Sequence, residues 1–534
     1  MKPEEVEIFE IKDKSLAARI GELITAHGKI TTPTLFPVIN PLYQEVSLET
    51  IKNIGYEAII TNAYILKKHR EQEVSKEGIH KYLNFNGPIM TDSGGYQILE
   101  YGDVEVEPHE IVKFQERIGS DIAVILDVPT GGQASYDEAK WTVEETLRRA
   151  RLSLKYIKEE KTIWVLPIQG GKYLDLLEYC AKKALEMPQY KMISIGSPTQ
   201  ILEKYDYQTL VKMIITVKNI IPPKYPVHLF GAGHPMFFPF AVALGIDTFD
   251  SASYILYAKD ERIILPHGTL RLREIKEIPC TCPVCSKYTV QELLSLRRDE
   301  RIKLLATHNL YIIWQEIKKI REAIRENTLW DLLEERRHSH PALLKAFKEL
   351  VKYSKYIEKY HPLPKPEISG IFLYDKLSLH RPEILRHRRN IVSKYKPPTA
   401  FKVALVLFDI EAKPITRTNF YREIREKVSI EDVHILVFMP YFGIVPEELA
   451  ETFPLSQHEK DYDEAVLANS LRVVYDYFLY HRDSYKKVVL AVKYPTLEVK
   501  NLAEKLSSEG LKTHVLRYSE ENVEDLVNEV LKFL

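Results

Sequence analysis

Eight short apolar runs rich in β-branched residues recur between residues 34 and 250, and this repetition constrains the fold more than any other feature. Each run ends in a polar or glycine-containing cluster, as buried parallel strands do. The segments between them include 137–158, 173–187 and 207–220, where apolar residues return every three or four positions as in surface helices. Eight strand and helix repeats predict an α/β fold, a (β/α)8 TIM barrel whose active site is built at the carboxyl ends of the strands. The predicted strands are 34–40, 58–64, 88–92, 122–128, 163–169, 193–197, 227–231 and 246–250.

The chain has 534 residues, which is too long for one ordinary core, so further domains are expected after the barrel. A second strand series begins near residue 400, with runs at 402–409, 434–439, 487–492 and 514–517, and predicts a smaller α/β domain. The predicted domains are a TIM-barrel catalytic domain at 1–275, a zinc-binding and helical subdomain at 276–361, a linker with a small basic module at 362–398, and a C-terminal α/β domain at 399–534.

The composition is that of a globular protein, with 45% hydrophobic residues and a formal net charge of -1. A net charge near zero means that the chain as a whole does not attract nucleic acid. RNA binding depends on local clusters of basic residues and not on the net charge, so an RNA partner is still possible. No apolar run is long enough to cross a membrane, and the first residues lack the features of a signal peptide, so we expect a cytoplasmic protein without a membrane partner. The four cysteines do not form a disulfide framework, and Cys180 is expected to be a buried thiol on a helix.

Three cysteines lie within six positions, as Cys280-x-Cys282-x-x-Cys285, and His308 follows 23 residues later. Three thiolates and an imidazole can surround zinc as a tetrahedron, and four protein ligands leave no open position on the metal. The spacing therefore predicts one structural zinc ion per chain. His308 taken alone would be a packed helix histidine, and the incomplete cysteine set favours ligation.

Two aspartates stand where predicted strands give way to loops, Asp92 in TDSGGYQ (91–97) and Asp250 in FDSASY (249–254). One carboxylate can attack a sugar carbon and hold it as a covalent ester, provided that a second group manages the proton on the departing fragment. The pair therefore indicates glycosyl transfer. For either aspartate alone, a strand-end cap or a turn residue is the competing interpretation.

Together with the cysteine cluster, these and three further segments make the chain similar to the tRNA-guanine transglycosylase family, and specifically to its archaeal branch. The resemblance covers roughly residues 10–310, and the further segments are LDVPTG (126–131), PIQGG (167–171) and SIGS (194–197). It implies exchange of guanine at position 15 of the tRNA D-loop for 7-cyano-7-deazaguanine, in archaeosine biosynthesis. It also implies that Asp250 is the nucleophile and that Asp92 is the general acid and base.

The resemblance further implies that Ser93, Asp127, Gln169 and Gly196 bind the base. A carboxylate such as that of Asp127 can accept both N–H groups of a guanine-like face, and the Gln169 side chain and the Gly196 backbone can donate to its oxygen. Without the resemblance, Gly196 would be interpreted as a strand-end turn and Gln169 as a polar cap. Base exchange is nearly isoenergetic, so it requires no phosphate-binding loop, and the sequence has no Walker-type motif.

A tRNA partner requires basic contacts, and the densest basic stretch is residues 380–389, with Arg297, Arg298, Arg301 and Lys303 beside the cysteine cluster. A solvated helix face is the competing interpretation. Archaeal members often end in an RNA-binding domain of the PUA type, which we do not recognise here, so a separate PUA-type protein is an expected partner. The resemblance also implies a homodimer, and residues 441–446 are similar to a domain of archaeosine synthase.

Three other functions compete with base exchange. An archaeosine synthase would act on the nitrile already installed in tRNA and would not need an exchange nucleophile. A non-catalytic, zinc-bearing tRNA-binding subunit would need neither aspartate. The presence of both Asp92 and Asp250 weighs against these two. A barrel enzyme with catalytic zinc is disfavoured because four protein ligands would saturate the metal.

Overall fold

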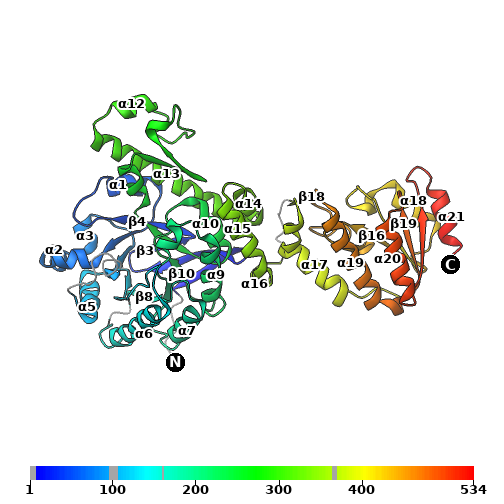
Figure 1. The fold of residues 1–534 in the computed structure, drawn as a ribbon, viewed down its shortest axis with the longest axis horizontal. Helices are drawn as coiled ribbons and strands as arrows, with labels where there is room; N and C mark the ends of the chain where they lie inside the picture. Colours follow the sequence, from blue (N-terminus) through cyan, green and yellow to red (C-terminus); the bar gives the residue numbers. More distant parts are fainter. Residues whose placement is uncertain (1–7, 96–105, 159–160, 364–369) are drawn as a thin grey trace. The chain divides into compact units, whose positions relative to one another are not determined.

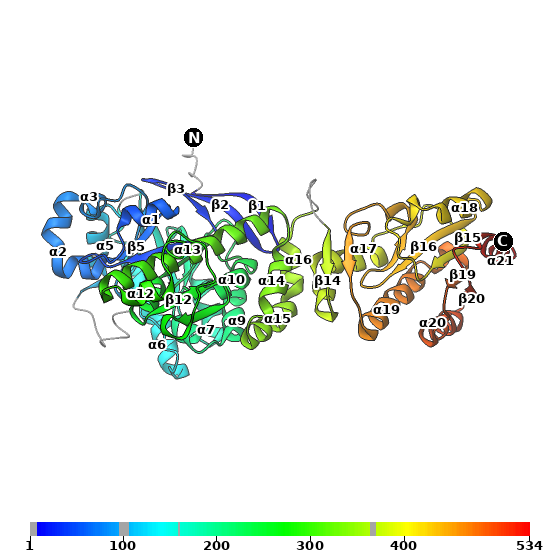
Figure 2. The same cartoon turned by 90° about the horizontal axis from the view of Figure 1, so that it is seen from above.

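The computed structural model describes residues 8–95, 106–158, 161–363 and 370–534. The chain divides into two compact units, Met1–Pro362 and Leu363–Leu534. Figures 1 and 2 show the elements of each unit from two directions.

The first unit is built on a closed barrel of eight parallel strands, in the order β10-β11-β4-β5-β6-β7-β8-β9 (Figure 1). Each predicted run contributes one strand, so the TIM barrel expected from the sequence is confirmed. The strands are shorter than the runs, in most cases because the last residues of a run belong to the following loop, whereas Asp92 and Asp250 stay within their strands. Their bounds are β4 (Thr34–Ile39), β5 (Ile59–Asn62), β6 (Ile89–Asp92), β7 (Ile122–Val124), β8 (Ile163–Ile168), β9 (Met192–Ile195), β10 (Val227–Leu229) and β11 (Thr248–Ser251).

Helices surround the barrel (Figure 1), and each of them carries buried apolar residues. Helix α6 (Tyr136–Ser153) begins with a capping box. The Ser135 hydroxyl accepts from the backbone N–H of Glu138, and the Glu138 carboxylate accepts from the backbone N–H of Ser135. Cys180 is fully buried on α7 (Leu174–Ala184), as predicted. The other helices of this ring are α1 (Leu48–Ile54), α2 (Ala63–Glu77), α3 (Ile79–Leu83), α5 (Pro108–Ile118), α8 (Thr199–Glu203), α9 (Tyr207–Lys218), α10 (Phe238–Ala243) and α11 (Ser253–Lys259).

A three-stranded antiparallel sheet, β1 (Phe9–Ser15), β2 (Ala18–Thr25) and β3 (Gly28–Thr32), closes the amino-terminal end of the barrel. Its residues Phe9, Leu23 and Ile30 share one buried cluster with side chains from the barrel strands, including Phe36 and Met90. The sequence did not indicate this sheet. The sheet therefore closes the end of the barrel that lies opposite the carboxyl ends of the strands.

The cysteine cluster lies in a loop between a two-stranded hairpin and a helical region. Helix α13 (Arg298–Arg325) carries His308 in its interior and packs against α11 and β12. The remaining elements of this region are β12 (Arg262–Leu265), β13 (Gly268–Arg271), α12 (Val290–Ser295), α14 (Leu329–Arg337), α15 (Pro341–Leu350) and α16 (Ser354–Tyr360).

The second unit contains a five-stranded sheet in the order β17-β16-β15-β19-β20, with β17 antiparallel, which confirms the predicted C-terminal α/β domain. Residues 371–373 and 382–393, expected to lie in the linker, form β14 and α17 and contribute Ile371, Leu373 and Ile384 to the core of this unit. The bounds are β14 (Ile371–Leu373), α17 (Pro382–Ser393), β15 (Phe401–Leu407), α18 (Asn419–Lys427), β16 (Val433–Met439), β17 (Gly443–Pro446), β18 (His458–Lys460), α19 (Glu464–Tyr480), β19 (Tyr485–Val492), α20 (Leu497–Ser508), β20 (Lys512–Arg517) and α21 (Val523–Leu531).

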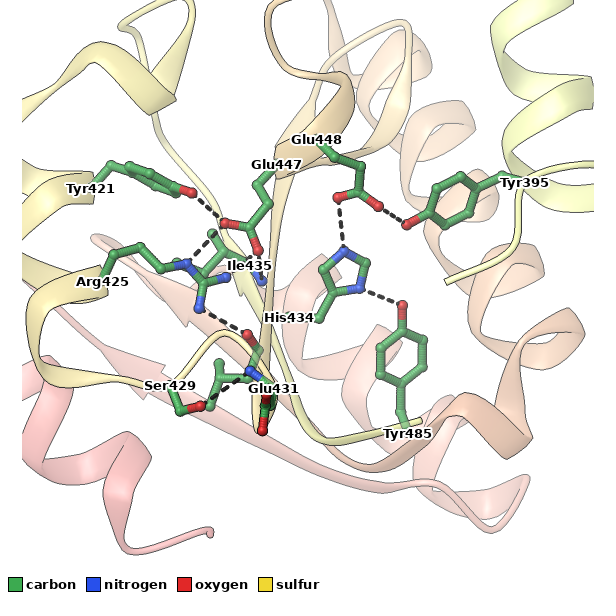
Figure 3. A network of polar contacts seen from close by, with 11 residues as sticks. Tyr395, Tyr421, Arg425, Ser429, Glu431, His434, Ile435, Glu447, Glu448 and Tyr485 are labelled. Atoms are coloured by element: carbon green, nitrogen blue, oxygen red, sulfur yellow. Dashed lines mark hydrogen bonds and ion pairs between the residues drawn. The ribbon is translucent and has the colours of Figure 1, made fainter. Parts of the chain in front are cut away.

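A polar network lies at one end of this sheet (Figure 3). Glu447 is paired with Arg425 and also accepts from the Tyr421 hydroxyl. Beside it, His434 contacts Glu448 at 3.1 Å and the Tyr485 hydroxyl at 2.8 Å. Each polar group therefore has a partner within the same unit.

In the part of the chain that the structure describes, no helix combines the length and the apolarity needed to cross a bilayer.

Candidate active site and metal cluster

The polar residues singled out by the sequence gather at the carboxyl ends of the barrel strands. Asp92 is the last residue of β6 and Asp250 lies in β11, while Gln169 and Gly196 directly follow β8 and β9. Asp127 follows β7 by three residues. Because all strands of the barrel are parallel, these ends meet at one opening, where barrel enzymes carry their active sites.

Asp250 is held by one oxygen only. Its Oδ1 accepts from the backbone N–H of Gly231 at 2.7 Å and contacts His228 Nε2 at 3.1 Å. The other ring nitrogen of His228 contacts the Thr248 hydroxyl at 2.9 Å. No hydrogen bond to Oδ2 occurs among the residues that the structure describes. One carboxylate oxygen is therefore fixed, and the other is open.

Asp92 lies close enough to Asp127 and Asp250 for their negative charges to affect its pKa. Burial, together with the charges of Asp127 and Asp250, raises the pKa of Asp92 to about 7. Backbone N–H groups of Ser93 and Gly94 oppose this shift, and Asn62 donates to Asp92 Oδ2 at 3.2 Å. A carboxyl group with this pKa can both give and take a proton near neutral pH.

Asp127 and Gln169 form a joined pair. Gln169 Nε2 donates to Asp127 Oδ2 at 2.6 Å, and burial raises the pKa of Asp127 to about 6. Two glycines leave room for this pair: a Cβ atom at Gly95 would lie 2.4 Å from Asp127 Oδ1, and one at Gly196 would lie 2.2 Å from Gln169 Nε2. Larger residues at either position would displace the pair.

Two of the predicted base-binding groups already have partners within the fold. The Ser93 hydroxyl donates to Ile125 O at 2.9 Å, and the Gly196 N–H donates to Ile168 O at 3.0 Å. The side-chain oxygen of Gln169 accepts from Thr130 N and from the Ser197 hydroxyl. What Gly196 contributes in this structure is space rather than a free donor.

The cysteine cluster brings together Cys280, Cys282, Cys285 and His308, whose ligand atoms all lie within 4.8 Å of one another. His308 Nδ1 lies 3.5 Å from Cys282 Sγ and 3.2 Å from Cys285 Sγ. Ligand atoms around a tetrahedral zinc ion lie about 3.5–3.8 Å apart, given bond lengths of about 2.3 Å to sulfur and about 2.0 Å to nitrogen. His308 Nε2 lies 3.0 Å from Ile264 O, so its proton sits on that side and the bare Nδ1 faces the sulfurs. The donor set and its spacing fit a metal ion.

Three residues of the site were not predicted: Asn62, His228 and Gly231. The sequence carried one usable signal, since His228 interrupts the apolar strand run VHLF three residues before a glycine. Asn62 ends β5, where its side chain also caps α2 by accepting from Ile65 N, and that local role conceals its contact with Asp92.

The basic segments have roles within the fold. Arg301 is buried, is paired with Glu261 and donates to two backbone carbonyls. In the 380–389 stretch, Arg381 is fully buried and Arg388 donates to Tyr441 O. Phosphate contacts by the basic segments stay a prediction. The side chains of Arg381 and Arg388 make contacts within the folded chain.

Three neighbouring carboxyl groups at the carboxyl ends of the strands of a closed parallel barrel are an arrangement typical of barrel enzymes. The comparisons agree: residues 13–342 match the family model described as queuine tRNA-ribosyltransferase. The chain therefore belongs to the tRNA-guanine transglycosylase family.

Several archaeal relatives carry the name tRNA-guanine(15) transglycosylase. The protein from Sulfolobus acidocaldarius is 44% identical over 455 residues, which cover 84% of this chain and 88% of the relative. The protein from Saccharolobus solfataricus is 44% identical over 492 residues, which cover 90% and 96%. The longer protein from Methanocaldococcus jannaschii is 45% identical over 461 residues, which cover 84% of this chain and 68% of the relative.

Proposed function

We propose that this chain exchanges guanine at position 15 of the tRNA D-loop for 7-cyano-7-deazaguanine, with Asp250 as the nucleophile. The observation that carries the proposal is the open Oδ2 of Asp250, set beside two further carboxyl groups at the barrel mouth. Membership of the family and the names of its archaeal relatives support the same reaction.

The first half of the reaction breaks the bond between the ribose anomeric carbon and guanine. Asp250 Oδ2 supplies the electron pair for a new ester bond to that carbon, while Asp92 donates a proton to the departing base. Its pKa of about 7 lets Asp92 be protonated before this step. In the second half the incoming base attacks the same carbon, gives its proton to Asp92 and releases the Asp250 carboxylate. Two displacements at one carbon retain its configuration.

Asp127 and Gln169 recognise the base in this proposal. Ionised Asp127 accepts from the adjacent N–H donors of the guanine-like face, and Gln169 fixes its orientation through the 2.6 Å bond. The second N–H of Gln169 Nε2 is the donor for the oxygen of the base. Ser93 acts by holding the loop after β6 through its bond to Ile125 O rather than by touching the base with its hydroxyl.

Cys280, Cys282, Cys285 and His308 hold zinc in this proposal, one ion per chain. With all four positions taken by protein ligands, the metal would fix the loop against α13 and take no part in base exchange. Metal analysis of the purified protein should give one zinc per chain, and Cys282→Ala should lose it. A full complement of zinc in that variant would reject the assignment.

The exchange is tested by incubating the chain with a tRNA transcript and radiolabelled guanine. We expect label to enter the transcript and to be displaced by unlabelled 7-cyano-7-deazaguanine. A transcript with adenine at position 15 is the control and should stay unlabelled. A covalent enzyme and tRNA adduct that survives denaturation should form with the wild type and be absent from Asp250→Ala. Incorporation that survives this substitution would remove the proposed nucleophile.

If wild type incorporates no label but acts on tRNA that already carries the nitrile base, the archaeosine synthase interpretation replaces this proposal. The cytoplasmic location, the homodimer and the separate PUA-type partner stay predictions. Size measurement of the purified chain alone and with tRNA tests the dimer.

A further inference from the structure

A cavity opens at the amino-terminal end of the barrel unit, on the side opposite the carboxyl ends that carry the aspartates. It lies between the β1 and β2 hairpin, the end of α9 and α16. Its polar lining consists of Lys14, Arg19, Lys218, Tyr356 and Tyr360, and the rest is aliphatic. Among the described residues, no carboxylate lines it.

Lys218 is the group that makes this cavity unusual. The residue is buried, with a relative exposure of 6%, and its side chain makes no hydrogen bond or ion pair within the described part of the chain. The ammonium end lies over Gly245, where a Cβ atom would come within 2.8 Å of Lys218 Cε. Glycine at this position, which has a φ of +99°, leaves the groove in which the lysine lies. An isolated buried ammonium group is costly unless something compensates its charge.

The neighbouring carboxylate of Asp247 compensates the charge of Lys218 only in part. Asp247 is committed to Arg19, with a 2.7 Å ion pair and a further bond to Arg19 Nε. Burial and the charge of Arg19 lower the pKa of Lys218 to about 7, although Asp247 opposes this shift. Lys14 adds a second free ammonium group at the rim. The Tyr356 hydroxyl donates to Leu244 O, and the Tyr360 hydroxyl makes no such bond among the described residues. The lining thus offers donors and positive charge without a free carboxylate.

We propose that this cavity binds a small oxyanion, such as sulfate, phosphate or a carboxylate group, with the Lys218 ammonium as its central ligand. Lys14 and the Tyr360 hydroxyl complete the set of donors. The site goes beyond the proposed base exchange, since it lies at the end of the barrel that β1–β3 closes. Binding there would stabilise the contact between the β1 and β2 hairpin and α16 without touching the reacting groups.

Calorimetric titration of the full-length chain with sulfate, against chloride at equal ionic strength, tests the proposal. We expect saturable binding by the wild type and at least about tenfold weaker binding by Lys218→Met, because a hydrogen bond to a charged group contributes about 1.5–3 kcal/mol. Sulfate keeps its charge between pH 6 and 8.5, so its affinity should fall over this range as Lys218 loses its proton. Titrations with phosphate and with acetate distinguish the kind of oxyanion.

Lys204→Met is the matched control, since Lys204 is an exposed lysine of the same unit and does not line the cavity. It should bind sulfate as the wild type does, and Lys218→Arg should retain binding because it keeps the charge. Absence of saturable binding by the wild type would overturn the proposal. Equal affinity in Lys218→Met, judged folded by circular dichroism, would do so as well. Base exchange by Lys218→Met should be unchanged, which separates this test from that of the proposed function.

Discussion

Two acidic residues, Asp250 in the barrel unit and Glu447 in the C-terminal unit, are almost equally buried, with relative exposures of 9% and 8%. Both oxygens of Glu447 are satisfied: Arg425 contacts both, the Tyr421 hydroxyl donates to Oε2 and Ile435 N donates to Oε1 (Figure 3). Asp250 has partners on Oδ1 alone, and its charge acts on the nearby carboxyl group of Asp92. Burial therefore does not distinguish a structural carboxylate from a reactive one, whereas saturation of its oxygens does.

Asp250→Asn gives the strongest test of this difference between the two carboxylates. The amide occupies the same space but cannot form the ester, so single-turnover incorporation of labelled guanine should fall by at least about 1,000-fold, or about 4 kcal/mol of activation free energy. The melting temperature should stay close to that of the wild type. Activity within tenfold of the wild type would show that the open oxygen is not the nucleophile.

Glu447→Gln should give the opposite pattern. Removing one charge of a buried pair leaves Arg425 uncompensated, and the expected loss is about 3 kcal/mol of unfolding free energy, measured by denaturant titration. Incorporation of guanine per folded molecule should be unchanged. A stable Glu447→Gln with reduced incorporation would instead give the C-terminal network a role in the reaction.

His228→Leu tests what the fixed oxygen of Asp250 contributes. It removes one partner of Asp250 Oδ1 while keeping a bulky buried side chain. With Oδ1 held less firmly, we expect kcat to fall about 10- to 100-fold with KM for tRNA unchanged, because misplaced reacting groups lower the rate of the chemical step. His228→Gln, which restores an N–H donor, should recover part of the loss. A fall in melting temperature with unchanged kcat would reduce His228 to a packing role.

The smallest expected effect concerns pH and Asp92. Burial, together with the carboxylates of Asp127 and Asp250, raises the pKa of Asp92 to about 7, so the carboxyl group is protonated below this pH and ionised above it. Because guanine departs with the donated proton, its single-turnover release should be fastest below pH 7 and should fall about tenfold per pH unit well above it. This fall in rate above pH 7 should be absent from the pH profile of Asp92→Asn. A release rate that rises between pH 6 and 8 would contradict the assignment of the acid.

The sequence alone determined the eight-stranded barrel, the C-terminal α/β domain, the cysteine cluster and the two aspartates that we propose as catalytic. These follow from local patterns: strand periodicity, metal-ligand spacing and short motifs at strand ends. Only the tertiary structure decided which residues contact the two aspartates. His228 meets Asp250 because β10 and β11 are neighbours in the barrel, and Asn62 meets Asp92 because β5 and β6 are.

The tertiary structure also decided which polar groups of the predicted base-binding residues are free. The Ser93 hydroxyl and the Gly196 N–H are engaged with carbonyls of neighbouring strands, which no local pattern reveals. The raised pKa of Asp92 and the isolation of Lys218 depend on burial by segments distant in the sequence. Covalent neighbours specify which residues stand at a strand end, but burial and hydrogen-bond saturation are set by residues that only folding brings together.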